Sequence, residues 1–214
     1  MYEIIDGWMV FNNRFNEPLT NVVFPMGIQK VKFGKCFNQD ISNLPNSITY
    51  LSFKYWGKFN QNVSKLPNSL THLTFGFYFN QDGSKLPNSL THLEFGHLFN
   101  QDVSNLSNSL VRLTFGDRFN QVVSQLPNSL TYLRFGYEFN QDVSQLPKSI
   151  TYLYFSLWYN SKFNQRLNPY LYHLTSFNIE DSHKHKAIML ARCQINQHNG
   201  AIRNDKLIDL LLKN

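Results

Sequence analysis

The sequence predicts a single repeat solenoid of mainly β structure, built from about eight stacked coils of 20 to 24 residues. Three observations lead to this fold class. The dipeptide Phe-Asn recurs at nearly constant intervals, beginning at residues 15, 37, 59, 79, 99, 119, 139 and 163. A phrase of the form Leu-Pro-Asn-Ser-Leu-Thr-x-Leu-x-Phe separates most copies, and it ends in a short alternation of polar and apolar residues. Repetition at such a period is the signature of a solenoid.

Each coil is expected to contain one short strand, as in residues 91–95. The alternation Thr91-His92-Leu93-Glu94-Phe95 places Leu93 and Phe95 on one face and His92 and Glu94 on the other. A glycine follows most strands, and we expect it to end the strand through an unusual backbone conformation. Twenty residues are too few for a strand, a full helix and two loops. We therefore expect the return side of each coil to be extended or a short 3₁₀ piece.

The apolar residues of each coil are expected to form inward columns. One coil cannot bury its own apolar face, so successive coils must stack and place equivalent residues above one another. Parallel strands lie about 4.8 Å apart, which sets the spacing of the columns. The predicted columns are Leu70/Leu90/Leu110/Leu130, Leu73/Leu93/Leu113/Leu133, Phe75/Phe95/Phe115/Phe135, Phe79/Phe99/Phe119/Phe139 and Leu86/Leu106/Leu126/Leu146.

The asparagine after each phenylalanine forms a polar column beside the core. Buried polar groups need hydrogen-bond partners, so we expect a buried ladder of amides that bond to the turn backbone of their own and neighbouring coils. The alternative is recognition of a partner by exposed asparagines. The residues are Asn38, Asn60, Asn80, Asn100, Asn120, Asn140 and Asn164.

The outward positions of the strands are the candidate partner-binding surface. The first outward column contains Tyr50, His72, His92, Arg112, Tyr132 and Tyr152, and the second contains Ser52, Thr74, Glu94, Thr114, Arg134 and Tyr154. These residues vary from coil to coil while the core columns do not. Tyrosine and arginine are common in interface hot spots, so a protein or peptide is the expected partner. The alternatives are a solvated face with no dedicated ligand, or binding of nucleic acid or another polyanion through basic and aromatic side chains.

We expect a folded, non-catalytic, intracellular protein located in the cytoplasm. The net charge of +6 is spread along the chain without blocks of one sign. Two cysteines, Cys36 and Cys193, form no spaced framework and are expected to be reduced thiols. Acidic residues near the N-terminus argue against a signal peptide, and no apolar run is long enough to span a membrane.

No nucleotide-binding, hydrolase or zinc motif occurs, so we expect neither an enzyme nor a cofactor. His72 and His92 fall on adjacent strands, but the nearby Arg112 would repel a metal cation. The column of Asp40, Asp82, Asp102 and Asp142 is better explained by turn stabilisation than by calcium binding.

The phrase Leu-x-x-Leu-x-Phe-Gly-x-x-Phe-Asn-Gln, preceded by Leu-Pro-x-Ser, resembles the FNIP repeat over residues of about 9 to 177. This relative of the leucine-rich repeat occurs in social amoebae and in giant viruses that infect amoebae. The resemblance implies a curved solenoid with parallel strands on its concave side. Family members often carry an F-box ahead of the repeats, which implies an adaptor role in a ubiquitin-ligase pathway. Here the pattern is already under way at Met9, which weakens that alternative.

Both ends of the solenoid, residues 1–178, are expected to be covered. After Phe177 the pattern changes, and residues 181–195 and 205–212 read as short amphipathic helices. We expect residues 179–214 to form a helical C-terminal cap, with a docking tail or a dimer contact as the alternative. The first coil is expected to be degenerate, with Trp8 covering exposed core.

Overall fold

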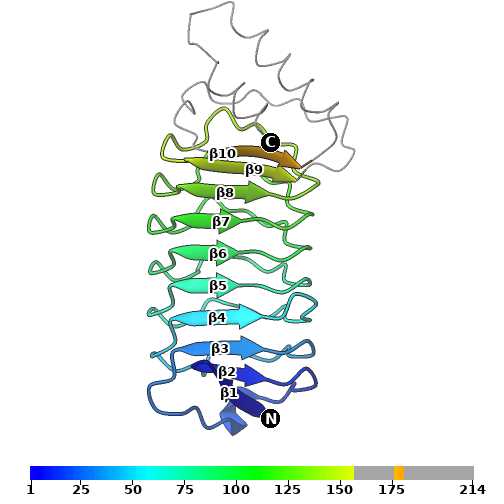
Figure 1. The fold of residues 1–214 in the computed structure, drawn as a ribbon, viewed down its shortest axis with the longest axis vertical. Coiled ribbons are helices and arrows are strands. Elements are labelled where there is room, and N and C mark those ends of the chain that lie inside the picture. The colour runs from blue at the N-terminus through cyan, green and yellow to red at the C-terminus, as the bar shows by residue number, and fades with distance from the viewer. Residues whose placement is uncertain (157–175, 181–214) are drawn as a thin grey trace, which may run out of the picture.

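The computed structural model describes residues 1–156 and the strand at 176–180. The described part is one ten-stranded sheet in which the strands follow one another in sequence order, like the rungs of a ladder (Figure 1). The strands are β1 (Tyr2–Ile5), β2 (Trp8–Phe11), β3 (Lys30–Phe33), β4 (Tyr50–Phe53), β5 (His72–Thr74), β6 (His92–Glu94), β7 (Arg112–Thr114), β8 (Tyr132–Phe135), β9 (Tyr152–Ser156) and β10 (Ser176–Glu180). The expected C-terminal helices, Asn164 and Cys193 lie outside the described residues.

All strands from β2 to β10 are parallel, and each strand from β3 to β9 is reached by one turn of the solenoid. Equivalent residues pair in register, so Leu73 lies beside Leu93 and Leu93 beside Leu113. The return side carries turns, and a short 3₁₀ helix, η1 (Leu19–Asn21), lies in the first coil. The predicted mainly β, leucine-rich-repeat-like solenoid is therefore confirmed.

The core is a stack of phenylalanine rings and leucine side chains. Every member of the five predicted inward columns is buried, with at most 9% of its surface exposed. Within one coil the rings of Phe95 and Phe99 lie 3.6 Å apart, and Phe99 stacks on Phe79 and Phe119 of the neighbouring coils at 6.1 Å. Two phenylalanines per coil thus form two continuous ring columns, which hold the coils together through apolar contact.

The glycine after each strand has a different role from the one expected. Gly34, Gly76, Gly96, Gly116 and Gly136 do not adopt positive φ; among the described glycines only Gly7 and Gly27 do. A Cβ built on Gly96 would instead collide with the backbone carbonyl of Gly76 in the preceding coil. The turns after the strands pack backbone against backbone, so these positions exclude any side chain. The expectation of an unusual backbone conformation was wrong.

Hydrogen bonds between coils come from the side chains that flank each strand. Thr71 Oγ1 donates to the carbonyl of Thr49 at 3.1 Å, and Thr91 Oγ1 donates to that of Thr71 at 3.1 Å. The hydroxyl of Ser89 donates to the Leu70 carbonyl at 2.6 Å, and most coils have an equivalent serine. These bonds give backbone carbonyls a hydrogen-bond partner along the edge of the sheet where the strands begin.

Candidate interaction surface

The outward side chains of β2 to β9 form one continuous surface, which we call the ladder face. Its first column comprises Trp8, Lys30, Tyr50, His72, His92, Arg112, Tyr132 and Tyr152, and its second comprises Val10, Lys32, Ser52, Thr74, Glu94, Thr114, Arg134 and Tyr154. The structure therefore brings together all twelve outward side chains that the sequence singled out. Each retains partial or full exposure, whereas the residues between them in the strands are buried.

The first column is a stack of rings and cations. Tyr50 and His72 stack with ring centroids 4.1 Å apart, as do His72 and His92. The guanidinium of Arg112 lies 4.0 Å from the centre of the Tyr132 ring, over its face. Tyr132 in turn stacks on Tyr152 at 4.4 Å. These contacts hold the side chains in fixed positions before any partner arrives.

The stacking decides which part of each ring a partner can reach. A ring with a neighbour on each face has no free face, so only its edge points to solvent. The edges carry tyrosine hydroxyls and imidazole nitrogens, and Arg112 adds N–H donors. The first column therefore presents a row of hydrogen-bonding groups, with little room for a base or other flat ligand to insert.

The second column is more uneven and carries charge of both signs. Ser52, Thr74 and Thr114 are short, whereas the guanidinium of Arg134 lies over the ring of Tyr154 at 4.8 Å. Desolvation by neighbouring side chains raises the pKa of the Glu94 carboxyl, and the charge of Arg134 partly opposes this shift. Glu94 is nevertheless exposed, so water still solvates its charged form.

The two histidines have an assignable proton position. The Thr71 hydroxyl donates to the Thr49 carbonyl and lies 2.9 Å from His72 Nδ1, and Thr91 repeats the arrangement with His92. A hydroxyl has one proton, so its oxygen accepts from Nδ1–H of the histidine. This network leaves Nε2 of each ring as the free acceptor.

The geometry of this histidine pair does not suit a metal ion. The ring planes are within 12° of parallel, so their Nε2 lone pairs run side by side and do not converge on one point. A zinc site needs several ligands aimed at one centre from about 2 Å. In the described part of the chain, no three His, Cys, Asp or Glu residues cluster as metal ligands would.

The ladder face is basic. Its two columns contain the cations Lys30, Lys32, Arg112 and Arg134 against the single carboxylate of Glu94. The ion pairs within the described ranges lie elsewhere, between His97 and Asp117 at 2.7 Å and between Arg118 and Glu138 at 2.8 Å. Both occur in the turns that follow the strands. Within residues 1–156, no carboxylate forms a salt bridge with the four cations of the face.

Trp8 belongs to the ladder face, so the expectation that it covers exposed core was wrong. Its ring lies edge-on to Tyr50 at 6.1 Å, and Lys30 Nζ lies 5.9 Å from its centroid. The core at this end is covered by β1, which pairs antiparallel with β2 and places Tyr2 against Phe11. Sequence reasoning did not identify this hairpin, although Asp6-Gly7 between two apolar runs is a known hairpin signal.

A groove of about 690 Å³ crosses this end of the ladder face. Side chains from the hairpin and from the first three parallel strands line it, including Ile5, Asp6, Trp8, Val10, Lys32, Ser52 and Lys54. Trp8 is its lining residue from the first column, and Val10, Lys32 and Ser52 come from the second column. The groove was not expected from the sequence, since it depends on the hairpin.

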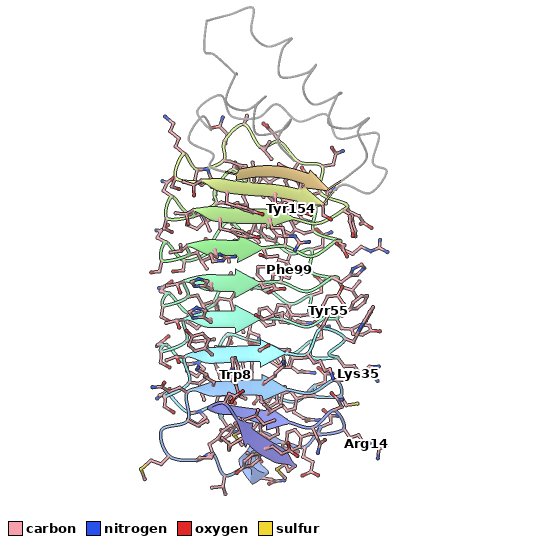
Figure 2. The ribbon with its side chains drawn as sticks, viewed as in Figure 1. Trp8, Arg14, Lys35, Tyr55, Phe99 and Tyr154 are labelled. Atoms are coloured by element: carbon pink, nitrogen blue, oxygen red, sulfur yellow. The ribbon has the colours of Figure 1, made fainter. Side chains whose placement is uncertain are left out.

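A second aromatic cluster lies at the edge where the strands end, around Tyr55 (Figure 2). Trp56 stacks on Phe77 at 4.9 Å, and Phe77 stacks on His97 at 4.3 Å. Tyr55 and Trp56 remain more than half exposed. They are the two extra residues of their coil, inserted where Lys54 occupies the place that glycine takes in most other coils.

The asparagine column lies on the turn that follows this edge. From Asn16 to Asn120, each Asn Oδ1 accepts the backbone N–H of the equivalent asparagine in the next coil, as Asn100 does from Asn120 at 2.9 Å. A glutamine side chain adds a second donor, such as Gln121 Nε2 at 3.0 Å from the same oxygen. The expected bonds to the backbone of neighbouring coils are present, but the six described members are half-buried and not buried as expected.

The aspartate column closes turns on the return side. Asp102 accepts hydrogen bonds from the hydroxyl and the backbone N–H of Ser104, and these bonds lower the pKa of its carboxyl. Asp82 and Asp142 bond to their serines in the same way. The carboxylates are thus occupied with turn groups.

Each coil contributes one β-strand to a parallel sheet, and a turn that carries an asparagine follows the strand. These features define a repeat solenoid of the leucine-rich-repeat type. The family model described as "FNIP Repeat" matches residues 15–55, 59–98 and 122–157, which together make up more than half of the chain. The chain belongs to the FNIP repeat family. No curated protein matches it.

One solved structure with a similar fold is that of CroV588, a giant-virus protein described as a novel circular LRR protein structure. It is 42% identical to this chain, with a TM-score of 0.67. The match covers 80% of this chain but only 26% of CroV588, so the chain spans about a quarter of that protein's length.

Solenoids of this type generally serve as protein-interaction scaffolds. In the part of the chain that the structure describes, no helix is long and apolar enough to cross a membrane.

Proposed function

We propose that the protein is a non-catalytic scaffold that binds another polypeptide along the ladder face. The observation that carries this proposal is the stacked first column, from Trp8 to Tyr152. Its rings and cations occupy fixed positions on a rigid sheet, and their polar edges point outward. Side chains that are already ordered lose less conformational entropy on binding, which favours affinity.

The variation of the face supports a dedicated partner. Core positions repeat leucine and phenylalanine in coil after coil, whereas the outward positions alternate among tyrosine, histidine, arginine, threonine and glutamate. Arginine and tyrosine are enriched among residues that dominate binding energy. The row of donors and acceptors in the first column suits the backbone and polar side chains of an extended peptide.

The stacking also weighs against nucleic acid as the partner. Single-stranded nucleic acids bind mainly through stacking of bases on free aromatic faces, together with phosphate contacts. In the central part of the ladder face the rings of His72 and Tyr132 already have a neighbouring side chain on each face. The four cations remain available to acidic side chains of a protein.

The proposal can be tested with a displayed library of random protein fragments selected against the purified chain. We expect the double variant Arg112→Glu/Arg134→Glu to lose at least tenfold in affinity for the selected fragments, because it reverses two of the four positive charges on the face. The matched control is Lys65→Glu/Lys85→Glu, which makes the same charge change at exposed return-side positions. Circular dichroism melts check that each variant is folded.

Equal loss in both variants would show that only net charge matters. Failure of the wild-type chain to select any fragment would overturn the proposal.

A further inference from the structure

The groove over β2, β3 and β4 differs from the rest of the ladder face in shape. In the second column the short side chains of Val10 and Ser52 flank Lys32, and the hairpin with Ile5 and Trp8 rises beside them. A volume of about 690 Å³ is enough for two or three residues of an extended peptide. The groove is a place on the ladder face where a partner's side chain can be partly enclosed.

The groove also carries an uncompensated positive charge. Lys32 is exposed, with no hydrogen-bond or ion-pair partner among the described residues. Lys54 Nζ donates to the amide oxygen of Asn13 at 3.1 Å, which leaves its charge without a counterion. Lys30 lies over the rings of Trp8 and Tyr50 beside this site. The one acidic side chain in the lining is Asp6, in the hairpin turn.

The lining combines these cations with an aromatic wall. Trp8 and Ile5 supply apolar surface, and Ser52 and Asn13 supply polar groups beside the lysines. Cations next to an apolar wall suit a carboxylate carried on a short apolar stem, as in glutamate. A carboxylate held there would make charge-assisted hydrogen bonds to the lysine ammonium groups.

We propose that this groove is an anchor pocket for an acidic side chain of the bound polypeptide, with Lys32 and Lys54 as the specificity-determining residues. The inference deepens the proposed function and rests on it, because it assigns the chemistry that the partner presents at one end of the ladder face. The partner segment is acidic, and it continues from the groove along the stacked first column towards Arg112.

The experiment selects random dodecapeptides displayed on phage against the purified full chain. The best binders are then synthesised with a fluorescein label, and their affinities are measured by fluorescence polarisation. We expect selected peptides to be enriched in Asp and Glu. We also expect Lys32→Glu/Lys54→Glu to weaken their binding at least tenfold, and Lys65→Glu/Lys85→Glu to weaken it much less.

A charge exchange provides a second arm. Replacing the acidic residues of the best peptide by lysine is expected to restore binding to Lys32→Glu/Lys54→Glu while abolishing binding to the wild-type chain. Such a reciprocal switch cannot arise from misfolding of the variant.

The other outcomes separate the two proposals. If peptides bind without acidic residues, or if binding is lost in Arg112→Glu/Arg134→Glu but kept in Lys32→Glu/Lys54→Glu, the groove assignment is wrong and the scaffold function stands. If the wild-type chain selects no peptide, both proposals fail. If labelled oligo(dT) binds more tightly than every peptide and depends on Lys32 and Lys54, the groove is a phosphate site and the acidic-peptide assignment is overturned.

Discussion

At the residue scale, each asparagine of the asparagine column connects two coils. Asn100 Oδ1 accepts the backbone N–H of Asn120 and the side-chain N–H of Gln121. We expect Asn100→Ala to lower the free energy of unfolding by about 1–3 kcal/mol, because it leaves a backbone donor without its partner. Urea denaturation followed by circular dichroism measures the change. The control is Asn128→Ala, since Asn128 is exposed on the return side and has no such bond.

Equal stability of Asn100→Ala and wild type would mean that water replaces the lost acceptor. The asparagines are only half-buried, so water can reach the backbone donor and either outcome is physically possible. The sequence predicted that these amides bond to backbone in neighbouring coils but could not show their depth. Nor did it show that the glutamine of the next coil also donates to each amide oxygen, as Gln101 does to Asn80 and Gln121 to Asn100.

At the element scale, strands β5 and β6 place two histidines in contact with each other. Desolvation lowers the pKa of both His72 and His92. The charge of His92 lowers the pKa of His72 further, and the charge of Arg112 lowers the pKa of His92 further. The unfolded chain therefore binds more protons than the folded chain as the pH falls below the ordinary histidine value of about 6.5. The contribution of the two neutral histidines to stability is fully present above that pH. It is lost as the pH falls towards their lowered pKa values in the folded protein.

We therefore expect the free energy of unfolding to fall between pH 7 and pH 5 and to do so less in His72→Gln/His92→Gln. Glutamine keeps a polar side chain at each position but does not titrate in this range. Urea denaturation at several pH values gives the slope for each protein. His183→Gln/His185→Gln is the control for other histidines. Parallel slopes in wild type and in His72→Gln/His92→Gln would contradict the expected role of the pair.

The strands also show how far the sequence could predict the candidate surface. A constant 20-residue step from Phe59 to Phe139 fixes the register, so it was possible to predict which outward residues share a column. Ring stacking between them depends on side-chain conformations, which a repeat pattern does not specify. Trp8 and the groove were missed because the first coils depart from the regular step and begin with an antiparallel hairpin.

At the scale of the whole molecule, each described strand pairs only with the strands next to it, and a few side chains such as Lys54 and Trp8 make single contacts two coils away. The strand order runs from β1 to β10 without a crossover, and no distant coil can substitute for a damaged neighbour. Stability in such a stack is a sum of coil terms and nearest-neighbour terms. A defect in a central coil therefore weakens two interfaces and can divide the molecule into separately unfolding parts, whereas a defect at one end weakens only one interface.

Phe99 lies in a central coil, so its replacement tests whether the two halves of the solenoid can unfold separately. It is fully buried and stacks on Phe79 and Phe119, so Phe99→Ala is expected to cost about 3–5 kcal/mol and to uncouple the coils on either side. In a Trp158→Phe background, fluorescence reports only Trp8 and Trp56 in the first coils, whereas circular dichroism reports all strands. Phe99→Ala should then unfold in urea with separate midpoints for the two probes. Phe15→Ala, in the first coil, should keep the circular dichroism transition of the later coils near its wild-type midpoint. Coincident midpoints in Phe99→Ala would show that the solenoid unfolds as one cooperative unit.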